Sequence, residues 1–498
     1  MKNPARLFFD LPARKLLVIA AILQLTVVLS LFAMGRLGLV PNTIDDHGLL
    51  RVAVPDARDY DRDATKAVEI LKQYGVHVWF ASYDAHLKFY SLCYLVFGPL
   101  LGNNILSAEP FNLGCYLAIL ILVFKIGEEL FDQAAARAAA AAVAIWPSFL
   151  LHNTQILKDP ICIAAMLTLV LVITMWLTRE LSWRMGLVTG LLGATAISLI
   201  YATRAAFWGL VLLGMILIGA AFLIFRNVRE RSFPIGNILS VLVVLLPALA
   251  GIFLNAASLT PKDQVAFPAE TANIAPANQN SAVITLDQPM NQSPAKGNNI
   301  QSEATPAVQS DKAPQDLSST YPHKRNRLIA LIQGMRDAFT DKYKDSATLI
   351  DSDAQFITTM DLVRYLPRAM AIGFLAPFPN TWLGKGRQVG LAGRLLAGAE
   401  MLAAYVLELF ALFGVWRARQ RLSTWVLLCV ILFGVTTLGL GIINVGALYR
   451  LRYGFFVLLI VLGMYGLSQI VPGIRDRSIA GERRPDLNKA TALATKSL

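Results

Sequence analysis

Lys158 and Asp159 stand side by side between two strongly apolar stretches of the chain. Ionisable residues are costly beside membrane-spanning segments, so a pair in this position indicates a functional site. Asp159 followed by Pro160 is also a common helix start, with the aspartate as N-cap. Lys158 does not fit that explanation, because a helix N-terminus disfavours a cation and favours an anion such as phosphate.

Acidic residues before residue 60 offer further chemistry. Asp56 precedes a short amphipathic segment, with Asp59 and Tyr60 close behind it. Its carboxylate is either the N-cap of a helix or a general base that reaches a substrate at the membrane edge. Asp45 and Asp46 form an acidic pair that could ligate a divalent cation through oxygen atoms, although a solvated loop is the plainer explanation.

Three arginines, Arg204, Arg450 and Arg452, stand at the ends of apolar stretches where the connections are short. Each could simply extend to the lipid headgroups. With Lys158 they would form a cationic surface at one membrane edge, and arginine binds phosphate through paired hydrogen bonds. We therefore expect a phosphate-bearing ligand there. Glu400 lies within a later apolar stretch, and we expect it to form a structural ion pair with an arginine.

The elements that position these residues are predicted to be membrane helices. The chain has 498 residues, 55% of them hydrophobic and 16% charged, and its apolar stretches approach the ~20 residues that cross a bilayer. The basic residues behind the net charge of +12 flank those stretches, a pattern that indicates membrane anchoring and not nucleic-acid binding. None of the four cysteines forms a CxxC pair, so neither a disulfide framework nor a zinc site is indicated. The sequence predicts an all-α, polytopic transmembrane bundle.

We predict about ten spans, at residues 16–35, 112–131, 134–151, 160–178, 185–201, 205–225, 236–258, 392–415, 423–445 and 454–472. Residues 89–101 are apolar but too short to cross, and we expect them to lie in the membrane interface. With that assignment most arginine clusters between spans are cytoplasmic, as are both termini, in agreement with the positive-inside rule. The loops that carry Asp56, Lys158 and Arg450 then face the outside.

Composition divides the rest of the chain. Within the large outer loop, residues 260–320 are rich in Pro, Ala, Asn, Gln, Ser and Thr and are predicted to be disordered. Residues 323–378 contain helical apolar spacing and are predicted to form interfacial helices. We predict four regions. They are an N-terminal core at residues 1–258, which includes the first loop (36–110), the large loop at 259–391, the C-terminal spans at 392–472 and a cytoplasmic tail at 473–498.

The order of these motifs resembles the GT-C superfamily of membrane glycosyltransferases, particularly bacterial relatives of the protein mannosyltransferase and aminoarabinose transferase group. The resemblance covers Pro55-Asp56 with Tyr60, Trp146-Pro147-Ser148, Leu157-Lys158-Asp159 and Arg450-Leu451-Arg452. It implies an enzyme of the bacterial inner membrane with an extracytoplasmic active site. Its substrates would be a polyprenyl-phosphate sugar donor and a lipid-linked or surface glycan acceptor.

The resemblance also implies roles for individual residues. Asp56 would activate the acceptor hydroxyl, while Asp159, Asp59 and Tyr60 would orient Lys158 or contact the sugar. The donor phosphate would be held by Lys158, Arg204, Arg450 and Arg452. The family often has paired acids where this chain has Asp56-Ala57, so Asp59 or the Asp45-Asp46 pair is the alternative partner, and dependence on a divalent cation is left open.

Two other function classes are compatible with the sequence. An O-antigen-type polymerase or ligase would also use outer arginines, but its catalytic residues would lie in the large loop. A lipid or solute transporter would place ionisable residues at the middle of the membrane and would show related halves. The spans offer little of either feature apart from Glu400.

Overall fold

The structure is a computed structural model that describes residues 12–51, 54, 56–204, 207–258, 327–342, 349–383 and 390–471. Regular secondary structure in these ranges is helical, apart from two isolated bridges. Met1–Ala257 and Asn326–Leu498 form one compact unit, separate from Ser258–Arg325. The spans predicted on either side of the large loop therefore belong to one unit. The predicted disorder of 260–320 and the tail 473–498 lie outside the described residues.

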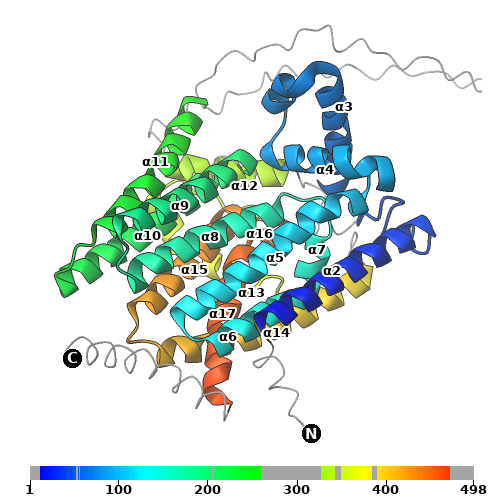
Figure 1. The fold of residues 1–498 in the computed structure, drawn as a ribbon. Coiled ribbons are helices and arrows are strands. Elements are labelled where there is room, and N and C mark those ends of the chain that lie inside the picture. The colour runs from blue at the N-terminus through cyan, green and yellow to red at the C-terminus, as the bar shows by residue number, and fades with distance from the viewer. Residues whose placement is uncertain are drawn as a thin grey trace, which may run out of the picture. The chain divides into compact units, whose positions relative to one another are not determined.

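The helices are labelled in Figure 1. The first half of the chain contains α2 (Ala13–Arg36), α3 (Asp56–Ser82), α4 (Ala85–Leu101), α5 (Ile105–Leu130), α6 (Gln133–Ala144), α7 (Pro147–Asn153), α8 (Asp159–Thr178), α9 (Trp183–Thr203), α10 (Phe207–Glu230) and α11 (Ile235–Ser258). The second half contains α12 (Arg327–Lys342), α13 (Thr359–Leu375), η3 (Pro379–Thr381), α14 (Gly390–Arg417), α15 (Leu422–Gly441), α16 (Val445–Leu451) and α17 (Tyr453–Ile470).

Eight of the described helices are long and apolar enough to cross a membrane, namely α2, α5, α8, α9, α10, α14, α15 and α17. The chain is therefore a multi-pass integral membrane protein. The difference from the ten predicted spans arises in two places. Residues 134–151 form two helices, α6 and α7, bent by 66°, which would make a ninth span if counted together. The Ile235–Gly251 part of α11 falls among the shorter apolar helices, as does α4.

The bend between α6 and α7 lies at Trp146 because Pro147 begins the second helix. Proline lacks the backbone N–H that would continue the hydrogen bonds of α6, but it fits the first turn of a new helix. Ser148 then donates its backbone N–H to Glu400 Oε1 at 2.6 Å, and the Tyr449 hydroxyl donates to the same carboxylate. The arginine partner predicted for Glu400 is thus replaced, within the described residues, by neutral donors.

The core of the unit is formed by α8, α15 and α17, whereas α2 and α14 are peripheral. Their most apolar windows are 72%, 67% and 78% buried in the first group and 28% buried in both helices of the second. Figure 1 shows α5, α8 and α9 side by side, with α10 also against α8. α14 packs closely on α17, because a Cβ on Gly414 would lie only 2.6 Å from Leu462 O. Such approaches through small residues are typical of membrane helices.

The bundle has two ends with different polar contacts. We call the end where α8 begins and α9 finishes the site end, since it carries Lys158 and Arg204. We call the opposite end, where α8 finishes and α9 begins, the far end. There Arg179 donates from Nε and Nη2 to the two oxygens of Glu129, at 2.8 and 2.5 Å, and Arg421 donates to Leu130 O at 2.9 Å.

Helix α12 confirms the helix predicted from the apolar spacing after residue 323. It buries Ile329 and Ile332, together with the guanidinium of Arg336. Arg336 donates to Leu440 O at 3.0 Å and lies 5.1 Å from the centre of the Phe356 ring. These contacts tie the described part of the large loop to the last turn of α15, at the site end.

Candidate functional site

Four charged residues from four segments meet at the site end of the bundle. Arg450, in α16, donates from Nη2 to Asp56 Oδ2 at 2.7 Å, at the beginning of α3. Its Nε lies 3.3 Å from Asp159 Oδ2, at the beginning of α8. Arg204, immediately after α9, donates from Nη2 to the other oxygen of Asp159. We call these four residues together with Lys158 the charge cluster.

The start of α8 gives the cluster its acidic centre. Asp159 is the first residue of this helix, and Lys158 occupies the N-cap position without a capping side chain. The N-cap role predicted for Asp159 is therefore wrong by one residue. Pro160, in the first turn, lacks a backbone N–H and suits that position. The carboxylate of Asp159 is thus free of a capping role and lies between the two guanidinium groups.

The cluster is buried, and its hydrogen bonds are incomplete. The side chains of Asp159, Arg204 and Arg450 are 4%, 11% and 14% exposed. The Nε atoms of Arg204 and Arg450 are buried without a hydrogen-bond acceptor, although Arg450 Nε is within ion-pair distance of Asp159. Burial, and secondly the Arg450 guanidinium, lower the pKa of Arg204 from its ordinary value. Buried guanidinium N–H groups without acceptors are costly, and an anionic ligand would satisfy them.

Lys158 forms no ion pair with any carboxylate in the described part of the chain. Its ammonium lies 5.7 Å from the centre of the Tyr60 ring, where the aromatic face offers a weak attraction. Burial, and secondly the nearby Arg204, lower the pKa of Lys158. The cluster itself holds three cations and two carboxylates, and the charge of Asp84 also acts on Lys158 from outside the cluster.

Tyr60 and His86 form an aromatic wall beside Lys158. Their rings meet edge to face, with centroids 4.8 Å apart. His86 is fully buried, and neither ring nitrogen has a hydrogen-bond partner. Burial, then Lys158 and Arg204, lower the pKa of His86 to about 3, so the ring is neutral at ordinary pH. Sequence analysis did not single out His86 as a site residue, because a lone histidine before an apolar segment has no distinctive spacing.

The segment that leads into Lys158 is held by polar side chains of other elements. Tyr90, in α4, accepts from the Leu157 N–H at 3.0 Å. Asn112, in α5, donates to Gln155 O at 3.2 Å, and the Gln155 side chain accepts from the Leu50 N–H at 2.8 Å. Buried backbone groups of an irregular segment need such partners in a membrane protein. The position of Lys158 is therefore supported by contacts made on Gln155 and Leu157.

A small, partly open pocket adjoins the cluster. Asp159, Arg204 and Arg450 line its polar part. Its remaining wall is mainly apolar and is formed by Cys162, Ile163, Met166, Trp208, Leu451 and Gly454, from α8, α10, α16 and α17. The arrangement suits a ligand with an anionic group attached to an apolar chain.

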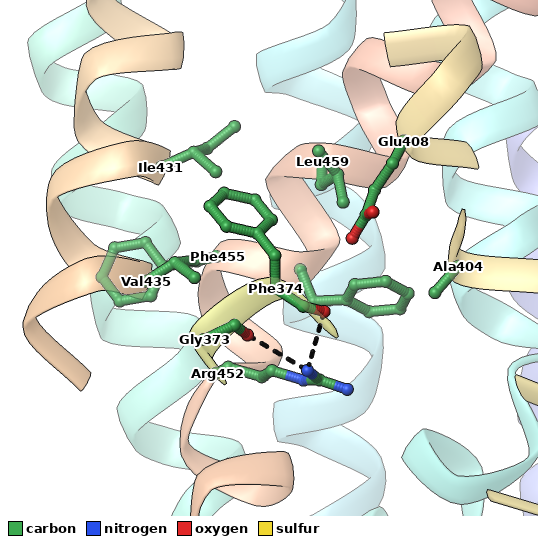
Figure 2. Close-up of a pocket in the computed structure, with 10 residues that line it drawn as sticks. Gly373, Phe374, Ala404, Glu408, Ile431, Val435, Arg452, Phe455 and Leu459 are labelled. Atoms are coloured by element: carbon green, nitrogen blue, oxygen red, sulfur yellow. Dashed lines mark hydrogen bonds between the residues drawn. The ribbon is translucent and has the colours of Figure 1, made fainter. Parts of the chain in front are cut away.

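Arg452 lies apart from the cluster, although sequence analysis grouped it with Arg450. Its guanidinium donates to the carbonyls of Gly373 and Phe374, at 3.1 and 3.2 Å, at the end of α13 (Figure 2). It lines another cavity, of about 280 Å³, which Glu408 also lines (Figure 2). A guanidinium at a helix C-terminus satisfies the last carbonyls and the helix dipole. These contacts give Arg452 a structural role between α13 and α17.

The other predicted acidic residues are also outside the cluster. Asp59 pairs with Arg62 at 3.1 Å, and its side chain is 64% exposed. Asp45 Oδ1 accepts from the backbone N–H groups of His47 and Leu49, at 3.1 and 2.8 Å, so it stabilises a turn. Asp46 is exposed. Among the described residues, no group of three or more His, Cys, Asp or Glu side chains is arranged to hold a metal ion.

Six of the ten predicted site residues are thus close together, namely Asp56, Tyr60, Lys158, Asp159, Arg204 and Arg450. They come from segments up to 394 residues apart. Their types and burial describe a largely buried cluster of mixed charge at the end of a membrane helix bundle. Comparison with protein-family models, curated proteins and solved structures gives no match to this chain.

Proposed function

We propose that this chain is a membrane glycosyltransferase of the GT-C type. It would transfer a sugar from a polyprenyl-phosphate donor to a hydroxyl group of a lipid-linked or surface glycan. The site end would then face the outside of a bacterial inner membrane. The observation that carries the proposal is the charge cluster, in which Arg204 Nε and Arg450 Nε are buried without acceptors, next to a pocket whose remaining wall is mainly apolar.

Each part of the cluster has a role in this reaction. The donor phosphate would lie against Lys158, Arg204 and Arg450, and the first part of its polyprenyl chain along Ile163 and Trp208. Arginine binds phosphate through paired hydrogen bonds, and an unpaired lysine adds a point charge. Dolichol- and polyprenyl-type lipids carry both chemical features, whereas a soluble nucleotide sugar would leave the apolar wall without a ligand.

The transfer is a displacement at the anomeric carbon of the sugar. The acceptor oxygen forms a bond to this carbon, and its proton passes to the Asp56 carboxylate. The bond from the carbon to the phosphate oxygen breaks, and its electron pair stays on the departing polyprenyl phosphate. The three cations stabilise the charge that develops on that phosphate. A positioned general base typically contributes about 10²–10⁴-fold to such a step.

A complementation experiment tests the proposal. In a strain that lacks the chain, mass spectrometry should show that one sugar is missing from a surface glycan and that a polyprenyl-phosphate monosaccharide accumulates. The wild-type chain and Asp63→Asn should restore the glycan, whereas Asp56→Asn should not. Asp63 is a suitable control because it lies on the same helix, its side chain is 38% exposed, and it pairs with Arg62 at 3.8 Å.

The same measurement separates the competing functions. Accumulation of complete lipid-linked repeat units would favour a polymerase or ligase. An unchanged glycan profile would contradict the transferase and favour a transporter. Full restoration by Asp56→Asn, with the variant present in the membrane at the wild-type level, would remove Asp56 from the mechanism.

A further inference from the structure

We propose that the ion pair between Asp56 and Arg450 is a lock, which the donor phosphate opens by taking the Arg450 guanidinium. The inference rests on the proposed function and adds an order of events to it. In the free protein the base is engaged and inactive. Only a chain that has bound a polyprenyl phosphate presents to the acceptor hydroxyl a carboxylate released from Arg450.

The contacts of Arg450 support such a lock. The Nε–H and one Nη2–H of a guanidinium point in the same direction and form the edge that grips two oxygens of one anion. In Arg450 this edge is divided, because Nη2 donates to Asp56 at 2.7 Å while Nε lies 3.3 Å from Asp159. The second contact is not aligned as a hydrogen bond, since neither Arg450 Nε nor Asp159 Oδ2 has a hydrogen-bond partner.

A phosphate would use this edge better than the two carboxylates do. Two phosphate oxygens can accept from Nε and Nη2 at once, and a third can reach Arg204, whose Nε is also buried without an acceptor. Asp159 would keep its bond from Arg204 Nη2. Asp56 is the carboxylate that the phosphate would displace from Arg450. Its side chain is the more exposed of the cluster's two acids, at 23% against 4% for Asp159.

Release of Asp56 matters for the chemistry. A carboxylate whose oxygen accepts from a guanidinium is held in its charged form and is a poor proton acceptor. Once Arg450 has turned to the phosphate, Asp56 loses this partner and becomes a better base. The lock therefore prevents activation of water or of an acceptor before a donor is bound. It also predicts that the donor binds first.

Binding of a polyprenyl phosphate without a sugar tests the lock, because this probe cannot be turned over. The purified full-length chain in detergent is titrated with the probe, and the dissociation constant is measured for each variant. Asp56→Asn should tighten binding by about tenfold, which corresponds to about 1.4 kcal/mol. Asp63→Asn should leave the constant unchanged, and Asp56→Glu should leave it close to wild type because it keeps the carboxylate.

A double-mutant cycle shows whether the effect passes through Arg450. In the Arg450→Gln background, Asp56→Asn should have no further effect on the affinity. Tightening of the same size in both backgrounds would mean simple repulsion between Asp56 and the phosphate, and it would overturn the lock. Unchanged or weaker binding by Asp56→Asn, with a wild-type melting temperature, would overturn it as well. If Asp56→Asn does not fold, Asp56→Ser replaces it in the cycle, because it also removes the carboxylate.

The outcomes distinguish the lock from the function on which it rests. If the wild-type chain does not bind polyprenyl phosphate, the proposed function and the lock both fail. If the wild-type chain binds the probe but Asp56→Asn does not bind it more tightly, only the lock fails. Steady-state kinetics then provide a second readout, because a lock requires an ordered mechanism in which the acceptor does not bind productively to the free enzyme.

Discussion

Arg179 at the far end and Arg450 at the site end both present the Nε and Nη2 edge of the guanidinium to carboxylates. Arg179 uses this edge on one partner, Glu129, with hydrogen bonds of 2.8 and 2.5 Å. Arg450 divides it between Asp56 and Asp159, and one of the two contacts is not a hydrogen bond. The Arg179 side chain is 54% exposed, whereas that of Arg450 is 14% exposed.

The difference separates anchoring from ligand binding. In the Arg179–Glu129 pair, a half-exposed arginine has both Nε and Nη2 satisfied by one carboxylate, so this edge is not open to another anion. Such a pair contributes modestly to stability. A buried guanidinium whose edge is divided between two carboxylates is unfavourable for folding because it is desolvated and incompletely hydrogen-bonded. Hydrogen bonds to a bound anion offset this unfavourable free energy. The burial and the unsatisfied hydrogen bonds of an arginine therefore indicate a site better than the presence of the arginine at a span end does.

The largest expected effect comes from removing the two arginines separately. Arg450→Gln should lower the transfer rate by roughly 10²–10³-fold, because it removes charge stabilisation of the departing phosphate. Arg179→Gln should change the rate by less than about twofold and the free energy of unfolding by about 1 kcal/mol or less. Transfer assays and thermal melts of both purified variants measure these changes. Equal losses of activity would break the distinction between the two ends.

Lys158→Met sharpens the comparison, because it removes a cation that forms no ion pair with a carboxylate among the residues that the structure describes. The affinity for polyprenyl phosphate should fall by roughly tenfold, as expected for the loss of one charged contact. The melting temperature should stay the same or rise, corresponding to about 1 kcal/mol of added stability at most, since binding residues are often unfavourable for the fold. A large drop in melting temperature with unchanged affinity would assign Lys158 a structural role.

The smallest effect, on stability alone, is expected for substitution of His47. Its pair with Asp61 is at the site end, but His47 is about half exposed, as Arg179 is at the far end. His47 Nδ1 lies 2.8 Å from Asp61 Oδ2, and Tyr94 also donates to Asp61. This hydrogen bond, opposed by burial and aided by the charges of Asp61, Asp46 and Asp45, raises the pKa of His47 above its ordinary 6.5.

Stability from a raised histidine pKa is present in full below the unfolded value and is lost as the pH rises through the folded value. The stabilisation of wild type over His47→Gln should therefore be greatest near pH 6 and shrink toward about pH 8. Melting temperatures of the two proteins across this range measure it. A difference that grows with pH would contradict the charged pair.

The sequence was sufficient to predict the helical membrane architecture because span length and hydrophobicity follow directly from the bilayer. It did not predict the bend at Pro147 as two helices, although a proline in the interior of an apolar run disfavours a continuous helix. The contact of Asp56 with Arg450 joins residues 394 apart, and no local pattern specifies such a distance. The types of the charged residues and their predicted side of the membrane reduced the number of candidate site residues, but did not show which of them are in contact.

Arg452 could have been separated from Arg450 by elementary helix geometry. Residues two apart on a helix do not face the same side, so an Arg-x-Arg sequence at a helix end directs its guanidinium groups to different places. Arg450 accordingly contacts Asp56, while Arg452 contacts the end of α13. No comparable local rule could have singled out His86. Its lowered pKa depends on burial and on Lys158 and Arg204, which only folding brings near it.

The pairing of Asp56 with Arg450 has a consequence for biosynthesis. Chains are made at about 5–20 residues per second, so the 394 residues between the two correspond to roughly 20–80 s on the ribosome. During that interval seven of the eight candidate spans are already made, while Asp56 and Asp159 still lack Arg450. Ser148 likewise lacks its partner Glu400 until a further 252 residues have been made. A chain that stops before α16 would thus carry most of the membrane domain but lack the Arg450 contacts of Asp56 and Asp159.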